Sequence, residues 1–227
     1  MKKISLSVLA LTTCMSMFAQ NYEKTTPMAS ATRFGLKAGV NFSTLKLEGS
    51  GNSNTSNSTE DLAGLNGGFF ANIPLGGVFK FQPELVYSSQ GSKFTSTTQV
   101  PFSGTVTSTS NMKLNYINLP LLIQAQTASG FFVETGPQLG YLIAAKNEPT
   151  GSNSGSESDL KDQMRTLDFA WAGGIGYLSR IGLGIDARYN FGFRNTFDDE
   201  NSANANLGQM KNRVMQFGLF WQFGAGK

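Results

Sequence analysis

The chain has 227 residues and a formal net charge of +3, with 18 basic residues against 15 acidic ones. A charge so close to neutral excludes the strongly basic footprint of a nucleic-acid-binding protein. The chain has no histidine, which excludes a Ser-His-Asp triad, and a single cysteine, which excludes an internal disulfide.

Residues 1–19 have the layout of a secretory signal peptide. Two lysines precede an apolar stretch, Ile4 to Phe18, which is too short for a spanning helix, and the small Ala19 follows it. Cleavage after Ala19 leaves 208 of the 227 residues, with 16 basic residues against 15 acids because two lysines are lost. A lipoprotein signal at Cys14 is an alternative that Thr13 fits poorly. The cleaved chain has no cysteine, so it offers no thiol nucleophile or Cys/His zinc site.

After a polar leader at 20–32, apolar residues alternate with small or polar ones in eight segments. Period-two alternation predicts strands, and no later segment has the roughly 18 uninterrupted apolar residues of a transmembrane helix. In chain order the segments are RFGLKAGVNF (33–42), LNGGFFANI (65–73), FKFQPELVYSS (79–89), KLNYINLPLLIQA (113–125), FFVETGPQLGYLI (131–143), LDFAWAGGIGY (167–177), LGIDARYNFGFR (183–194) and MQFGLFWQF (215–223).

The connections between these segments alternate in length. PLGG, QTAS and SRIG are short turns, whereas the linkers 43–64, 90–112, 146–164 and 195–211 are long and rich in Ser, Thr, Asn, Gly and acids. This pattern predicts an all-β protein, an eight-stranded antiparallel up-and-down transmembrane β-barrel over 33–224. Short turns would lie in the periplasm with both termini, and four long loops outside the cell.

In such a barrel the apolar face of each strand faces lipid and the small or polar face lines the interior. The segment 113–125 is apolar on both faces, and we place Ile117 and Ile123 outward. Pro120 cannot donate to a ladder and predicts a bulge or a local break there. The residues expected to face lipid include Phe169, Trp171, Tyr189, Phe191, Phe217, Leu219, Trp221 and Phe223.

The predicted interior carries charged residues of both signs in equal number: Lys37, Lys80, Glu84, Glu134, Asp168, Asp186, Arg188 and Arg194. Buried charges need partners, so we interpret them as an ion-pair network that fills a closed lumen. An acid/base or ion-conducting site is the alternative. Glu134 and Arg188 form the pair to test first. We expect no catalytic residue, no cofactor and no metal site.

Three acidic stretches in the long linkers leave calcium binding open, because carboxylate oxygens suit that ion. They are Ser58–Asp61, Glu157–Asp162 and Asp198–Glu200. None has the spacing of an EF-hand loop, so solvated loop charge is the simpler interpretation.

Several segments together resemble the PorT-like outer-membrane β-barrel family of Bacteroidetes over roughly residues 33–224. They are FQPELVYSSQGSKF, LNYINLPLLIQ and GFFVETGPQLGYLIAAK, with FGLKAGVNFS at the start and GLFWQF at the end. The resemblance implies an eight-stranded barrel in the outer membrane of a Gram-negative cell envelope. The last aromatic strand looks like a signal for the barrel-assembly machinery, although GAGK follows Phe223. Some family members are linked to protein secretion or gliding, and the family offers no shared catalytic residues.

The leading hypothesis is therefore a non-enzymatic outer-membrane barrel that contacts lipid and recognises an extracellular or envelope protein through its loops. A closed barrel has no edge to cap, so we expect a monomer. The alternatives are a lipid-modifying or proteolytic outer-membrane enzyme using inward carboxylates, a small pore, and a soluble lipocalin-like carrier with its apolar face inward.

Overall fold

The computed structural model describes residues 31–48, 55–100, 104–150, 158–161, 164–195 and 209–224. The barrel unit begins at Thr32. The predicted signal peptide, nearly all of the polar leader, the acidic stretch Asp198–Glu200 and part of Glu157–Asp162 lie outside the described residues. Within the part of the chain that is described, no helix is long and apolar enough to cross a membrane.

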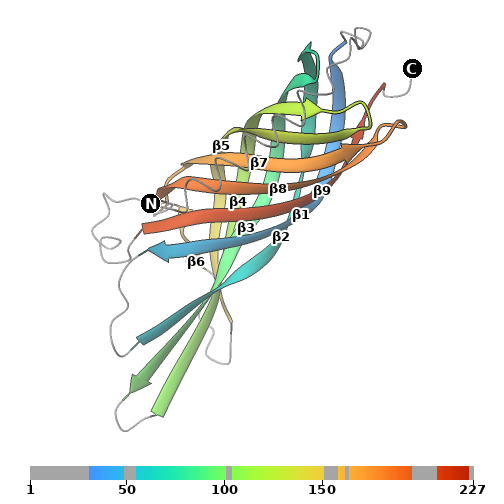
Figure 1. The fold of residues 1–227 in the computed structure, drawn as a ribbon. Coiled ribbons are helices and arrows are strands. Elements are labelled where there is room, and N and C mark those ends of the chain that lie inside the picture. The colour runs from blue at the N-terminus through green and yellow to red at the C-terminus, as the bar shows by residue number, and fades with distance from the viewer. Residues whose placement is uncertain are drawn as a thin grey trace, which may run out of the picture. The chain divides into compact units, whose positions relative to one another are not determined.

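The unit is a closed antiparallel barrel, as the sequence predicts (Figure 1). Its strands are β1 (Arg33–Glu48), β2 (Thr55–Gly76), β3 (Phe79–Val100), β4 (Gly104–Gln126), β5 (Phe131–Thr150), β6 (Ser158–Asp159), β7 (Leu167–Leu178), β8 (Leu183–Asn195) and β9 (Gln209–Gln222). Each long strand pairs with its neighbours in the chain, and β1 pairs with β9 to close the ring. The two-residue β6 is an addition on β5, so eight strands form the wall.

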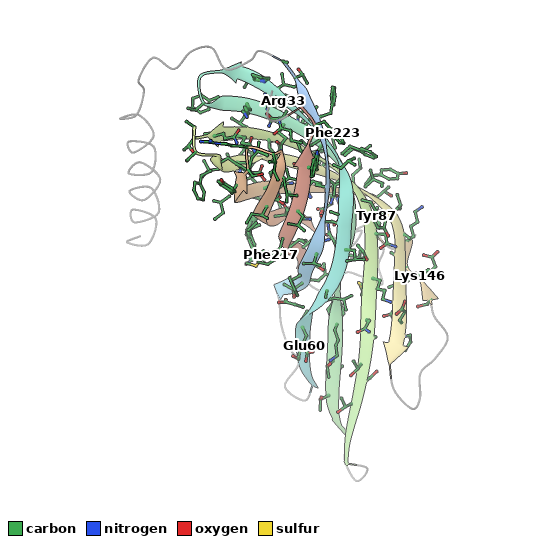
Figure 2. All side chains as sticks on the ribbon, turned by 90° about the vertical axis from the view of Figure 1, so that its right-hand side faces the viewer. Arg33, Glu60, Tyr87, Lys146, Phe217 and Phe223 are labelled. Carbon is green, nitrogen blue, oxygen red and sulfur yellow. The ribbon has the colours of Figure 1, made fainter. Side chains whose placement is uncertain are left out.

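Three short turns lie at one end of the barrel, which we call the turn end. They connect β2 to β3, β4 to β5 and β7 to β8, where the sequence predicts them. Gly76 and Gly77 have φ values of 114° and 58° in the first turn, a conformation that side chains with a Cβ rarely adopt. The first and last strands also meet here, because the Phe223 amide donates to the Phe34 carbonyl at 2.8 Å. In Figure 2, Arg33 and Phe223 lie toward this end and Glu60 toward the opposite one.

Side chains alternate between an exposed apolar outside and a buried interior along all eight wall strands. The predicted faces are confirmed, including that of β4, where Leu119 and Ile123 are exposed and Tyr116, Asn118 and Gln124 are buried. The structure also decides between the two alternatives predicted at Pro120, in favour of a local break. The pairs on either side, Pro83–Leu121 and Val86–Asn118, keep one register, so no bulge lies there. Only the ladder is interrupted between them, and the register shift of β4 against β5 falls between Asn115 and Tyr116.

Strands β2, β3 and β4 are much longer than the sequence indicates and correct the prediction of long loops. Their 22, 22 and 23 residues exceed the roughly 9–11 that cross a bilayer. They continue together beyond the rest of the wall, as Figure 1 shows. We call this part the projecting sheet: Thr55–Asp61, Ser92–Val100, Gly104–Asn111 and Asn147–Thr150. It occupies most of the linker 90–112 and smaller parts of the linkers 43–64 and 146–164, which we expected to be loops. The end that bears it is the projecting end.

Candidate functional site

The lumen is filled by side chains in successive layers, beginning at the turn end with amides and one lysine. Lys80 donates to the Gln126 side-chain oxygen. Asn72 donates to Gln82 Oε1 at 2.8 Å and to Gln124 Oε1 at 3.1 Å. This layer closes the interior directly behind the short turns.

Three phenylalanine rings form the next layer. Phe220 lies between Phe70 and Phe132, with ring centroids 5.7 and 5.9 Å apart. Each ring fits over a glycine of a neighbouring strand. A Cβ on Gly184 would lie 2.1 Å from the Phe220 ring, and a Cβ on Gly35 would lie 2.2 Å from the Phe70 ring. The small residues of the inward face therefore make room for aromatic rings.

An ionic layer follows, centred on Arg188 of β8. Its two terminal nitrogens donate to the two Glu84 oxygens at 2.8 and 2.9 Å, a bidentate pair. Its Nε and Nη2 also donate to Glu134 Oε1 at 2.9 and 2.6 Å. These three side chains are 2–4% exposed. Arg188 thus neutralises carboxylates from two other strands, β3 and β5, inside the wall.

Lys37 of β1 completes the ionic layer. Its Nζ lies 3.3 Å from Glu84 Oε2 and 3.1 Å from Asp186 Oδ2. Gln82 donates to the other Glu84 oxygen at 2.8 Å. We call Lys37, Glu84, Glu134, Asp186 and Arg188 the ionic layer. Its two cations face three carboxylates, so every charged group has an opposite charge in contact.

Amides and hydroxyls fill the lumen beyond the charges. Asn41 donates to Ser88 Oγ at 2.8 Å and accepts hydrogen bonds from Asn66 at 2.6 Å and Gln216 at 3.1 Å. Ser43 donates to the Gly91 carbonyl at 2.9 Å one step further along β1. These bonds join β1, β2, β3 and β9 across the interior.

An apolar cluster closes the projecting end. It consists of Leu45, Met112, Leu114, Tyr116, Leu142, Ala145 and Met164, with Phe94 and Leu160 packed against it. The segment after β5 is tied to it, because Leu160 donates its amide to Ala145 and Leu142 donates to Thr166. The alternation along the sequence does not reveal this cluster, because Leu45, Met112 and Met164 lie in three predicted linkers. The sequence did offer one sign of this cluster, because Leu114 and Tyr116 both fall on the inward face of their predicted strand.

Five of the eight charged residues predicted for the interior meet in the ionic layer. Lys80 is buried at the turn end instead, separated from the layer by the phenylalanine rings. Asp168 is half-buried on β7 and pairs in register with Gly140, well along β5 from Glu134. The backbone of Arg194 belongs to β8, and its side chain lies outside the described residues.

The filled lumen leaves little space. A cavity of about 10 Å³, room for about one water molecule, is lined in part by Lys37, Glu134, Asp186 and the phenylalanine rings. Asp186 Oδ1 is buried without a hydrogen-bond partner among the described residues. No group of three or more acidic, histidine or cysteine side chains in the described ranges is arranged to hold a metal ion. The two carboxylates that line this cavity are both bound to cations.

The eight residues expected to face lipid are all exposed on the outside of the barrel: Phe169, Trp171, Tyr189, Phe191, Phe217, Leu219, Trp221 and Phe223. They belong to an exterior where the large apolar side chains of every wall strand are exposed. Water is a poor solvent for so much contiguous apolar surface, and a bilayer is the environment that suits it.

A family model described as outer membrane protein beta-barrel domain matches residues 18–198. The chain belongs to this family. Its location is the outer membrane, and its fold is the family's β-barrel. The matched region ends before β9, the strand that closes the ring in the structure. No protein with a curated description matches the sequence significantly.

Solved barrels of the outer membrane are similar in structure. Neisserial surface protein A has 14% identity and a TM-score of 0.49, with 85% of this chain and 99% of that chain covered. The attachment invasion locus protein Ail of Yersinia pestis, in complex with the heparin analogue sucrose octasulfate, has 10% identity, a TM-score of 0.47 and coverage of 85% and 99%. OprG from Pseudomonas aeruginosa has 12% identity and a TM-score of 0.43, with 86% of this chain and 97% of that chain covered.

Proposed function

We propose that this protein is a non-enzymatic outer-membrane anchor that holds the projecting sheet outside the cell for recognition of another protein. The observation that carries the proposal is the length of β2, β3 and β4, which continue far beyond the apolar band as paired strands. A rigid sheet on a barrel presents its side chains at lower entropic cost than four flexible loops would.

The composition of the projecting sheet suits a recognition surface. Hydroxyl side chains dominate both of its faces, and cross-strand pairs such as Thr95–Thr109 and Thr97–Thr107 lie 3.5 Å apart, at the limit of a hydrogen bond. Hydroxyls that are held this weakly remain able to bind water or a partner. Such a surface offers many donors and acceptors and little apolar area.

One edge of the projecting sheet has no neighbouring strand among the described residues. β1 pairs with β2 only as far as Ser43–Leu62 and continues with β9 to Glu48. Within the described ranges, the β2 segment Thr55–Asp61 is therefore paired with β3 on one side only. Unpaired backbone groups at a sheet edge can accept a further strand, which favours an extended segment of a partner protein at this place.

The interior supports binding over catalysis. Glu84, Glu134 and Asp186 all contact cations within the ionic layer, and a carboxylate held in this way is a poor general base. The closed ring favours a monomer, and the aromatic final strand favours delivery by the barrel-assembly machinery. Membership of the PorT-like group, with its link to secretion, is supported by the segments quoted above.

Cysteine labelling in intact cells tests the orientation, because the chain has no cysteine beyond Cys14. We expect Thr97→Cys in the projecting sheet to react with a membrane-impermeant maleimide. The matched control is Ser129→Cys in a short turn at the turn end, which should react only after the outer membrane is opened. Labelling of Ser129→Cys alone in intact cells would reverse the orientation.

Photo-crosslinking in the native host tests recognition. A benzophenone side chain at Thr97 should give a discrete protein adduct, and one at the outward Tyr87, within the apolar band, should not. A variant in which Asn-Gly replaces Thr95–Thr109 should lose the adduct formed from a second probe at Ser58. Equal adducts from Thr97 and Tyr87, or none from either, would make the projecting sheet a spacer and not a recognition surface.

A further inference from the structure

On the outward face of β9, the side chains change from apolar to charged at Arg213. From Phe223 back to Met215 every second residue is large, apolar and exposed. This stretch is as long as the ~9–11 residues with which a tilted strand crosses a bilayer. The outward face of β1 follows the same course from Phe34 to Phe42, and the next outward residue, Thr44, pairs with Arg213. Arg213 therefore lies where the hydrocarbon ends and the lipid headgroups begin, at the projecting end.

The guanidinium of Arg213 is held in place by aromatic rings. Its Cζ lies 5.0 Å from the centroid of the Phe191 ring, which is the cross-strand neighbour on β8. Phe191 in turn packs edge-on against Phe193, with centroids 5.3 Å apart. A cation stacked on a ring keeps its hydrogen-bonding edge free, so Phe191 presents the guanidinium without neutralising it.

No Asp or Glu side chain of the described residues neutralises Arg213. Its guanidinium forms no ion pair with a described residue, and its Nε is buried without an acceptor. Two other outward cations toward the same end are different. Lys93 lies 2.9 Å from Glu60, and Lys113 lies 2.6 Å from Glu148. An arginine at the edge of an apolar surface, with no counter-ion among the described residues, can take one from its surroundings.

We propose that Arg213 binds a phosphate group of an outer-leaflet lipid headgroup. The planar fork of a guanidinium matches phosphate oxygens in bidentate geometry, and phosphate is the anion that a lipid headgroup supplies at this depth. Lipid A, which carries phosphates in the outer leaflet of Gram-negative bacteria, is the source we assign. The assignment of Arg213 to the outer leaflet rests on the orientation proposed above.

Binding of purified full-length barrel to diphosphoryl lipid A in non-ionic detergent tests the site. Arg213→Gln should raise the dissociation constant about tenfold, which corresponds to the loss of roughly one charge-assisted hydrogen bond. Arg213→Lys should recover part of the affinity. Phe191→Leu, which keeps the arginine and removes its support, should weaken binding by less than Arg213→Gln. Lys113→Gln is the matched control, because its cation is already paired, and should bind as wild type.

Unchanged affinity of Arg213→Gln, with the barrel intact by its heat-dependent gel mobility, would overturn the proposal. Binding of dephosphorylated lipid A as tight as that of diphosphoryl lipid A would also overturn it, because only acyl contacts would then remain. Competition by inorganic phosphate as strong as that by lipid A would overturn it too, because it would indicate a site for free anions. The experiment uses detergent and does not depend on orientation. A failure of this site is therefore distinguishable from a failure of the labelling test at Thr97.

Discussion

Arg188 joins strands that are far apart in the sequence, since it binds Glu84 and Glu134 at once. Sequence alternation predicts that all three side chains point inward, because parity along a strand decides the face. It cannot predict that they meet, because depth in the lumen depends on the register between strands. The same limit explains why Lys80, which has the same parity, lies at the turn end and outside the ionic layer.

Replacing Arg188 with alanine should lower the free energy of unfolding by about 3–5 kcal/mol, because Glu134 would remain buried without a cation and Glu84 would keep only Lys37. The measurement is urea unfolding in detergent, followed by gel mobility without boiling. Lys113→Ala removes the exposed pair with Glu148 and should cost less than ~1 kcal/mol. Equal losses from the two variants would show that Arg188 does not stabilise the lumen.

Gly184→Ala should destabilise the barrel by about 1–3 kcal/mol, because its Cβ would overlap the Phe220 ring. Gly173 is the control, since a Cβ there meets nothing within 4 Å. Gly173→Ala should unfold at the same urea concentration as the wild-type protein. Combining Gly184→Ala with Phe220→Leu should recover part of the loss, and a failure to recover any would mean that backbone conformation and not space requires the glycine.

At the scale of the elements, the turns and eight wall strands follow from the sequence, whereas the length of β2, β3 and β4 does not. Apolar alternation marks a strand only where one face is apolar, and the projecting sheet is polar on both faces. Its many threonines were the missed signal, because a β-branched residue favours the extended backbone whether or not it is buried. The apolar cluster at the projecting end was hidden by the same error, since Met112 and Met164 lay in predicted linkers.

The wall should fold without the outer part of the projecting sheet. Joining Phe94 to Ser110, which pair in register, by Asn-Gly removes Thr95–Thr109 and keeps Phe94 against the apolar cluster. The shortened barrel should still change gel mobility on boiling. Its free energy of unfolding in urea should stay within about 1 kcal/mol of wild type, because the removed hydroxyl pairs are part-buried or exposed. Loss of the folded band would show that the sheet is needed for the barrel to form.

At the scale of the whole molecule, the layers close the lumen from the turn end to the projecting end. An eight-stranded barrel has an interior just wide enough for side chains, and here amides, rings, charges and the apolar cluster fill it in turn. We therefore expect the barrel to separate two compartments and not to connect them.

Purified protein in a planar lipid bilayer should therefore give no discrete conductance steps in concentrated KCl. The control is a well-behaved porin inserted under the same conditions. Reproducible steps from the wild-type barrel would contradict a closed lumen and favour the pore hypothesis over recognition.

The seam between β1 and β9 has a consequence for biogenesis. It joins the first strand to the last, from Gly35–Gln222 to Glu48–Gln209. A ribosome must finish the chain, and export must deliver all of it, before the ring can be sealed. Any product that stops short of Gln209 lacks β9 and leaves the facing edges of β1 and β8 without a partner strand. The order in which the strands are synthesised thus keeps the ring open until the last strand is delivered.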